Sequence, residues 1–403
     1  MTDTTQHASP LPSPEDLSAE VRAWLGRNRR AVPGAAEPWS ATSASIAWAE
    51  KVVDAGYAVP MWPADWFGRA YPSELASVIE REFAAAGAPG AAQDKYNIGA
   101  NTILRFGSDR LKHDLIRDAL TGRARFCLFY SEPGAGSDLA GVRTTAVRDG
   151  DHWVVNGQKV WTSGAASADF ALMIARTDWD VPKHQGLSYF VVPMNQPGIE
   201  VRPLVQITGE SHFNEVFITD AIVPGDYVVS EPGQGWRVLQ TALAYERSIM
   251  GDGARASRYG TLADDLIGLA REHGRLDDPV VRDKLATALA LRELNALNSA
   301  RAKAAAEQGT SSPVMSLGKL AMAGILHAEA RLRTEIIEAE SLLAGGDNPE
   351  ADDVNFLLLN AFFTSIGGGT NQIQRNIIGE RVLGLPKEPE VDRDTPFRDV
   401  RRS

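Results

Sequence analysis

The order of helical and strand-like segments is the feature that most limits the fold of this chain. Residues 126–229 consist of short runs of Val, Ile, Phe, Tyr and Thr, whereas the segments before and after show helical periodicity. The dipeptides Asp149-Gly150 and Asn156-Gly157 stand between these runs as hairpin signals. Helices, then strands, then helices predict an α+β fold, not the alternating units of a parallel sheet.

These segments predict three domains. They are an N-terminal helical domain over 1–125, a central β-domain over 126–235 and a C-terminal helical bundle over 236–403. The helical periods of the bundle cover 236–273, 279–307, 313–344, 353–364 and 370–383. A chain of 403 residues, 44% hydrophobic and 23% charged, is long enough for two or three such domains.

Charge and cysteine content exclude several functions. The formal net charge of −11 argues against nucleic acid or an anionic membrane as the main partner, because both require a basic surface. Cys127 is the single cysteine, which excludes an intramolecular disulfide, and we expect it to be a small core residue. The seven histidines show no pair at ligand spacing, so we predict no metal site. The first twenty residues resemble no targeting signal, and we expect a cytoplasmic protein without membrane insertion.

Glu246 occupies an unusual position in a predicted helix. The other members of its stripe, at three- or four-residue spacing, are Trp236, Leu239, Leu243 and Met250. No Lys or Arg stands three or four residues from Glu246, so a carboxylate in this stripe needs a partner from elsewhere or a proton. Periodicity does not single it out, however, because Glu293 shows a similar pattern.

The segment "SEPGAGSD" contains two glycines. Gly134 and Gly136 are spaced like the start of a dinucleotide fingerprint, but Leu139 takes the third position and no βαβ unit follows. One interpretation is a ligand loop, in which glycine lets the backbone approach and Ser131 and Ser137 offer hydroxyl groups. An ordinary polar turn explains the segment alone equally well.

Two further segments combine turn residues with polar groups. In "NGQKVWTSG" we expect a hairpin and a strand that ends at Trp161, Thr162 and Ser163, where an indole beside hydroxyls suits a flat heteroaromatic ring. Trp161 by itself is more often a core residue. In "SIGGGTNQIQ" three glycines precede Thr370, a good N-cap, and the free N–H groups of that helix start favour an oxygen ligand. A plain glycine-rich loop accounts for the second segment about as well.

The chain resembles the acyl-CoA dehydrogenase family over residues 48–398. The resemblance rests on "YSEPGAGSD", "VVNGQKVWTSG", "ALAYER" and "GGGTNQIQRNIIGERVLGLP" at family spacing. It implies an N-terminal helical domain, a central β-domain and a C-terminal four-helix bundle, with FAD between the last two. The implied flavin contacts are Tyr130, Ser131, Gly136, Ser137, Trp161, Thr162, Ser163, Thr370 and Gln372. Ser137 is also implied to touch the acyl-CoA.

Two departures from the family pattern matter. Many members carry the catalytic glutamate where this chain has Gly368. A smaller group, which includes isovaleryl-CoA and actinobacterial sterol-degrading dehydrogenases, carries it on an earlier helix before an arginine, as in "YERSIMG". The resemblance thus implies Glu246 as the base, Arg247 as a substrate-side residue, and Gly368 with Gly369 near the thioester oxygen. Without the resemblance, a structural Glu246 paired with an arginine would be the better interpretation.

The second departure concerns assembly. The segments "REHGRLDDPVVRDKLA" and "LLAGGDNPEADD" match poorly the family runs that reach the FAD of a neighbouring subunit. We therefore expect a homodimer, a homotetramer or a heterotetramer with a homologous subunit.

The predicted function is FAD-dependent oxidation of an acyl-CoA to the trans-2-enoyl-CoA, with electrons passed to an electron-transfer flavoprotein. One alternative is a non-catalytic or half-site subunit of a heteromer. Another is an oxygen-using flavoenzyme on the same fold. The sequence does not define whether the acyl group is fatty, branched or sterol-derived.

Overall fold

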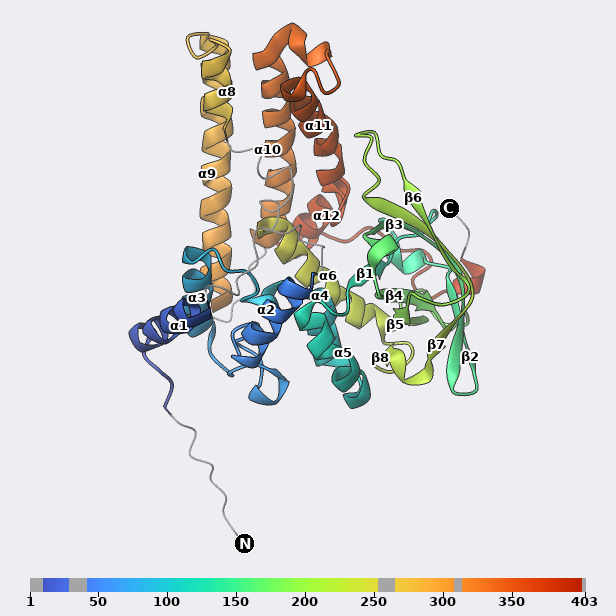
Figure 1. Cartoon of the computed structure of the whole chain (residues 1–403). Coiled ribbons are helices and arrows are strands. Elements are labelled where there is room, and N and C mark those ends of the chain that lie inside the picture. Colours follow the sequence, from blue (N-terminus) through green and yellow to red (C-terminus); the bar gives the residue numbers. More distant parts are fainter. Residues whose placement is uncertain (1–9, 29–41, 253–264, 308–313, 401–403) are drawn as a thin grey trace. The chain divides into compact units, whose positions relative to one another are not determined.

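A computed structural model describes residues 10–28, 42–252, 265–307 and 314–400 (Figure 1). Contacts between Cα atoms divide the chain into two compact units, Met1–Arg125 and Phe126–Ser403. The first is helical, and the second holds a sheet followed by long helices, which confirms the predicted α+β class. Among the described residues, no helix is both long and apolar enough to cross a bilayer.

The N-terminal unit is built from short amphipathic helices. They are α1 (Pro14–Asn28), α2 (Ser43–Asp54), α3 (Ser73–Ala85), α4 (Ile98–Phe106) and α5 (Asp109–Thr121). The side chains of Thr42, Asn97 and Ser108 accept hydrogen bonds from backbone N–H groups and thereby start α2, α4 and α5. The aromatic core contains Trp24, Trp48, Tyr57 and Phe83.

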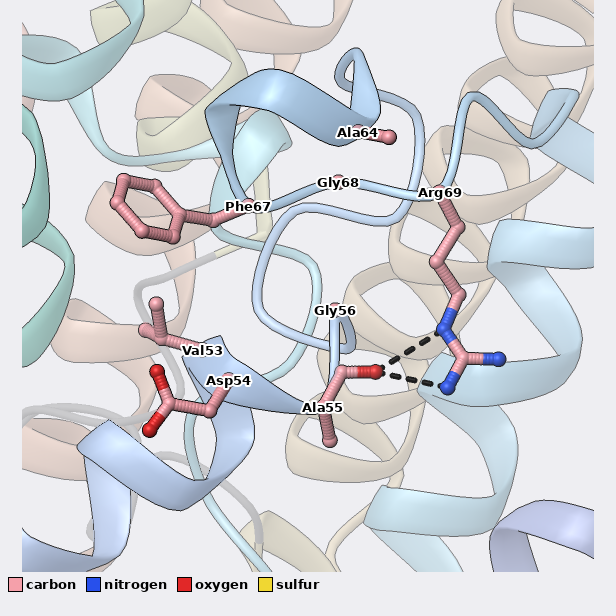
Figure 2. A pocket seen from close by; sticks show the side chains of 8 residues that line it. All are labelled: Val53, Asp54, Ala55, Gly56, Ala64, Phe67, Gly68 and Arg69. Atoms are coloured by element: carbon pink, nitrogen blue, oxygen red, sulfur yellow. Dashed lines mark hydrogen bonds between the residues drawn. The ribbon is translucent and has the colours of Figure 1, made fainter.

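A cavity of about 330 Å³ opens beside the turn that follows α2 (Figure 2). Asp54, Phe67 and Arg69 form part of its wall. The Arg69 guanidinium donates to the carbonyl oxygen of Ala55 at 3.0 and 2.7 Å and lies 4.3 Å from the centroid of the Tyr57 ring. These contacts engage the guanidinium within its own unit. None of the residues predicted to bind cofactor or substrate lines this cavity.

The second unit begins with one sheet. Its strands are β1 (Phe126–Phe129), β2 (Thr145–Asp149), β3 (His152–Ser163), β4 (Phe170–Arg176), β5 (Leu187–Pro193), β6 (Ile199–Leu204), β7 (Phe213–Pro224) and β8 (Val228–Val229). The order across the sheet is β6-β7-β3-β2-β4-β5-β8, and β1 pairs in parallel with β4. Cys127 is buried in the core of this sheet with Phe129 and Phe190, which confirms its expected role as a small core residue.

One predicted hairpin is right and the other is wrong. Asp149-Gly150 leads into the turn between β2 and β3, where Gly150 has a φ of 57°. Gly157, in contrast, lies inside β3, beside a shift in the register between β3 and β7. A Cβ on Gly157 would come within 2.4 Å of the Thr144 hydroxyl oxygen. This glycine therefore serves close packing at a bulge and does not form a turn.

Long helices complete the second unit. They are α6 (Gly235–Asp252), α8 (Leu266–Glu272), α9 (Pro279–Glu307), α10 (Val314–Ile337), α11 (Pro349–Thr364) and α12 (Asn371–Arg381), with a 3₁₀ segment η8 (Glu338–Leu342). Helix α10 contacts α6, α8, α9, α11 and α12, and Figure 1 shows it between α9 and α11. The predicted period 236–273 is not one helix, because Asp265 caps a new helix by accepting from the N–H of Gly268.

The end of the described chain returns to the sheet. The Arg176 guanidinium at the end of β4 lies 3.5 Å from the centroid of the buried Phe397 ring, and the Trp179 ring packs on the same phenylalanine at 5.4 Å. The N–H groups of Phe397 and Arg398 donate to the carbonyl oxygens of Val181 and Trp179 at 3.0 and 3.1 Å. The chain end thereby covers an arginine that is itself fully buried.

Candidate active site

Helix α6 carries Glu246. The helix contacts β4, β5 and α10. It starts in close contact with β5, because a Cβ on Gly235 would lie 2.5 Å from the carbonyl carbon of Ser188. Leu239 is fully buried, and Glu246, two turns further along, is half-buried. Glu293, whose sequence pattern is similar, is exposed on α9. The two glutamates have similar sequence patterns but differ in burial, and only Glu246 is partly buried.

Two buried tyrosines lie within electrostatic reach of Glu246. Tyr130 directly follows β1 and Tyr189 belongs to β5, and their hydroxyl oxygens are 2.5 Å apart. Burial raises the pKa of both hydroxyl groups, and the negative charge of Glu246 raises it further. This electrostatic coupling links Glu246 to the end of β1, where the chain enters the 131–138 loop. Tyr130 as a whole is 7% exposed, and its carbonyl oxygen accepts from the Lys159 ammonium at 3.1 Å.

A buried ion pair anchors the 131–138 loop. The fully buried Lys159 ammonium donates to the Glu132 carboxylate at 2.8 Å and to two backbone oxygens at 3.1 and 2.9 Å. The same carboxylate accepts from two backbone N–H groups at 2.7 and 2.9 Å. Burial opposes ionisation of Glu132, but the Lys159 charge and these hydrogen bonds outweigh it and lower the pKa of the carboxyl group. The loop therefore leaves the sheet in a defined direction.

Beyond this anchor the loop is open. Ser131 is half-buried, whereas Gly136 and Ser137 are exposed. A Cβ added at Gly134 or at Gly136 would meet no heavy atom within 4 Å. The glycines therefore leave room for another molecule to approach the backbone, as the ligand-loop interpretation requires. Reciprocal backbone hydrogen bonds between Glu132 and Ala135 also form an ordinary polar turn, so both interpretations stay open.

The three predicted site residues at the end of β3 differ in exposure. Trp161 is 61% exposed and has a φ of 62°, a left-handed conformation that is strained for an aromatic residue. Ser163 is exposed as well, whereas Thr162 is 1% exposed. The side chain of Asn214 holds the carbonyl oxygen of Thr162 at 3.0 Å. The indole and the Ser163 hydroxyl are thus accessible, and the Thr162 side chain points into the sheet.

The glycine-rich turn joins α11 to α12. Gly368 and Gly369 have φ angles of 64° and 92°, which only glycine adopts without strain. Thr370 accepts from the N–H of Ile373 at 3.1 Å, so its predicted role as an N-cap is confirmed. Gln372 is exposed on the first turn of α12.

A row of aromatic rings connects this turn to the end of β3. The Phe213 ring of β7 packs against Trp161 at 6.0 Å and against Phe363 of α11 at 5.4 Å, measured between ring centroids. A Cβ on Gly367 would lie 2.5 Å from the Phe363 ring, so the turn rests directly on that ring. The sheet and the α11–α12 turn therefore contribute to one face of the unit.

Three participants in this region, Tyr189, Lys159 and Glu132, escaped sequence analysis. Tyr189 lies in the apolar strand "LSYFVV", which offers no sign of function. Lys159 and Glu132 both stand in quoted motifs, but their pairing follows only from the fold. The side chain of Arg247 lies outside the described part of the chain.

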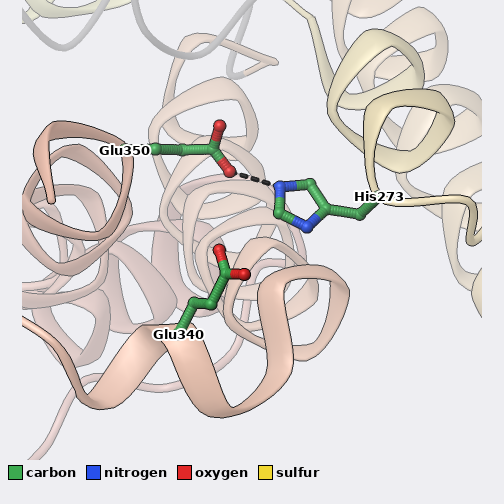
Figure 3. Close-up of side chains that lie close together, drawn as sticks. All are labelled: His273, Glu340 and Glu350. Atoms are coloured by element: carbon green, nitrogen blue, oxygen red, sulfur yellow. Dashed lines mark hydrogen bonds and ion pairs between the residues drawn. The ribbon is translucent and has the colours of Figure 1, made fainter.

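A separate group of metal-ligand side chains lies among the long helices. His273, Glu340 and Glu350 bring one potential ligand atom each within 4.8 Å of one another, although their sequence spacing gave no sign of it (Figure 3). His273 follows α8 and is paired with Glu350 of α11. Both glutamates are exposed, and the imidazole–carboxylate pair accounts for the arrangement as a contact between helices.

Fold, motifs and site geometry together define the class of the protein. The profile described as acyl-CoA dehydrogenase, middle domain, matches residues 127–221, and acyl-CoA dehydrogenase, C-terminal domain, matches 233–383. The chain belongs to the acyl-CoA dehydrogenase family of oxidoreductases.

The curated relatives include mycobacterial dehydrogenases. Acyl-CoA dehydrogenase IpdE1 of Mycobacterium tuberculosis is 36% identical over 93% of this chain and 98% of its own length. Acyl-CoA dehydrogenase FadE34 of the same organism is 36% identical over 92% of this chain, but over 51% of its own length.

Solved structures agree with the family assignment. The "Tcur3481-Tcur3483 steroid ACAD" has a TM-score of 0.72 and 27% identity, with 94% of this chain and 99% of that chain covered. The ChsE4-ChsE5 complex from Mycobacterium tuberculosis has a TM-score of 0.68 and 29% identity, with 95% of this chain and 100% of that chain covered.

Membership of this family makes the chain an FAD-dependent oxidoreductase. The residues of the second unit fit such a cofactor. Trp161 presents an exposed ring, Ser137 and Ser163 present accessible hydroxyls, and Gly136 leaves the backbone uncovered. Among the described residues, the buried Gln374 side-chain oxygen has no hydrogen-bond partner, so a polar acceptor near the start of α12 is still unsatisfied.

Proposed function

We propose that this protein removes hydrogen from the α and β carbons of an acyl-CoA thioester and forms the trans-2-enoyl-CoA. The observation that carries the proposal is the place of Glu246. It is half-buried on α6, and its charge acts on tyrosines at the end of β1 and in β5. Tyr130, on which this charge acts, directly precedes the loop that we assign to the flavin.

The proposal assigns a task to each of four site residues, Glu246, Gly368, Gly369 and Ser137. Glu246 removes the α-proton as general base. Bound FAD supplies the electron sink for the hydrogen that leaves the β-carbon. We assign the thioester oxygen to the backbone at Gly368 and Gly369, where no Cβ obstructs the approach. Ser137, exposed on its loop, is assigned to both cofactor and substrate.

The similar proteins favour a substrate class, and the family resemblance implies an electron acceptor. One similar structure is described as a steroid ACAD, so we assign acyl chains of fatty or sterol origin. Electrons would pass to an electron-transfer flavoprotein, and we infer a cytoplasmic location.

A second candidate function is that of one subunit in a heteromer. Two similar structures are two-component complexes, Tcur3481-Tcur3483 and ChsE4-ChsE5. In that case the chain would share a site with a homologous partner. Glu246 favours the catalytic role for this chain over a supporting one.

The test is an anaerobic titration of the purified flavoprotein with a panel of acyl-CoA thioesters. Substrate should bleach the flavin in the wild type and in Glu293→Gln, which removes an exposed helical carboxylate. Glu246→Gln should retain flavin but not bleach. Bleaching that persists in Glu246→Gln would remove this residue from the proposed role. Flavin that binds only after co-expression with a second subunit would favour the heteromer, and rapid reoxidation by oxygen would favour an oxidase.

A further inference from the structure

The sheet encloses a pair of bonded hydroxyl groups with no role in the proposal above. Strands β1 and β5 lie on opposite sides of β4, and Tyr130 and Tyr189 reach each other across it. Their oxygens are 2.5 Å apart and their rings are tilted by 55°. The two residues are 7% and 0% exposed, so water does not compete for this bond.

Two tyrosine hydroxyl groups carry two hydrogen atoms. The bond between Tyr130 and Tyr189 uses one of them, and the second can be donated to another acceptor. A donor in a buried site is costly to leave unpaired, so a third group is expected to accept it.

Glu246 has the chemistry for this acceptor and is half-buried on α6. Its helix, α6, contacts β5 directly. Its negative charge also contributes to the raised pKa of both tyrosines. An ionised carboxylate accepts only, and a bond from a hydroxyl to a charged oxygen is stronger than one between neutral groups.

We propose that Tyr130 and Tyr189 form a two-hydroxyl relay that ends on the carboxylate of Glu246, orients this base and stabilises its ionised form. The inference rests on the proposed function of Glu246. Tyr130 and Tyr189 are positioning residues, since they act through the glutamate. Their alternative role is to fill the core of the sheet.

The main test is the pH dependence of flavin reduction by substrate in Tyr189→Phe and Tyr130→Phe, measured anaerobically in a single turnover. Loss of a hydrogen bond to the ionised carboxylate should move the acid limb of the profile to higher pH by about 1 unit. The rate should recover at high pH, where the base is ionised again. A purely structural pair would change stability or flavin content and leave this limb in place.

Matched variants keep the test decisive. Tyr57→Phe removes another buried hydroxyl that donates to a carboxylate, that of Glu20 at 2.7 Å, in the other unit, and should not move the limb. The double variant Tyr130→Phe/Tyr189→Phe leaves no orphaned hydroxyl and should fold where a single variant does not. Both substitutions remove the same relay. The acid limb of the double variant should therefore shift by as much as that of the more strongly affected single variant, and not by the sum of the two single shifts.

A second readout does not depend on turnover. Infrared spectra of the oxidised enzyme without substrate should contain the band of a protonated carboxyl group that is lost in Glu246→Gln. This band should appear at higher pH in the tyrosine variants than in the wild type. Unmoved profiles and an unmoved band, with bleaching still abolished in Glu246→Gln, would overturn the relay and leave the base assignment intact. Bleaching in Glu246→Gln would instead overturn the proposed function.

Discussion

The buried pair of Lys159 and Glu132 allows a quantitative prediction. In Lys159→Met the carboxylate keeps its two backbone N–H donors, but its cation is gone, and two backbone oxygens lose their donor. Removal of one partner from a buried ion pair costs about 3–5 kcal/mol, because the remaining charge stays uncompensated. Each kcal/mol lowers the melting temperature of a domain of this size by roughly 2–4 °C, which predicts a loss of roughly 6–20 °C.

Thermal unfolding of the apoprotein, followed by circular dichroism, measures this loss. Lys183→Met is the matched control. The Lys183 ammonium lies 3.1 Å from the carboxylate of Asp138, an exposed residue at the far end of the same loop. That surface pair should contribute about 1 kcal/mol or less. The double variant Glu132→Gln/Lys159→Met removes both charges and should recover part of the loss. If Lys159→Met has the same melting temperature as Lys183→Met, the buried pair does not anchor the loop and our reasoning is refuted.

Three further outcomes follow from the same region. Trp161→Ala should lower flavin affinity at least several-fold without loss of thermal stability, since the indole is 61% exposed; an unchanged flavin Kd would count against the assignment. Gly157→Ala should destabilise the sheet by about 1–3 kcal/mol in urea titrations, because its Cβ would meet the Thr144 side chain at 2.4 Å, and an equally stable variant would contradict this packing. The lowered pKa of Glu132 contributes stability above the unfolded-state value of about 4.3, and this stability is lost as pH falls through the folded-state value. Acid unfolding should therefore show a weaker pH dependence in Glu132→Gln, and parallel curves would argue against it.

Local patterns in the sequence were sufficient for much of the fold. The N-cap at Thr370 and the turn at Gly150 depend on residues within a few positions of each other, so the sequence predicts them correctly. The signal at Gly157 failed because the pairing of β3 with β7 overrides a local turn preference.

The site required long-range information. Glu246 and Glu293 share a periodic pattern, and their different burial depends on which helices pack on the sheet. Tyr189 meets Tyr130 across 59 positions of the chain, and no spacing rule connects two residues so far apart. Family resemblance implied Glu246 as the base and identified the motifs, but it did not identify the buried groups that pack around them.

The return of Phe397 to the sheet has a consequence for synthesis on the ribosome. Arg176 is synthesised long before Phe397, so the guanidinium at the end of β4 lacks this aromatic cover until position 397 has emerged. A stop codon before position 396 would leave that cation in a half-built interior permanently. Chains truncated before position 396 should thus be less soluble than chains that contain Phe397.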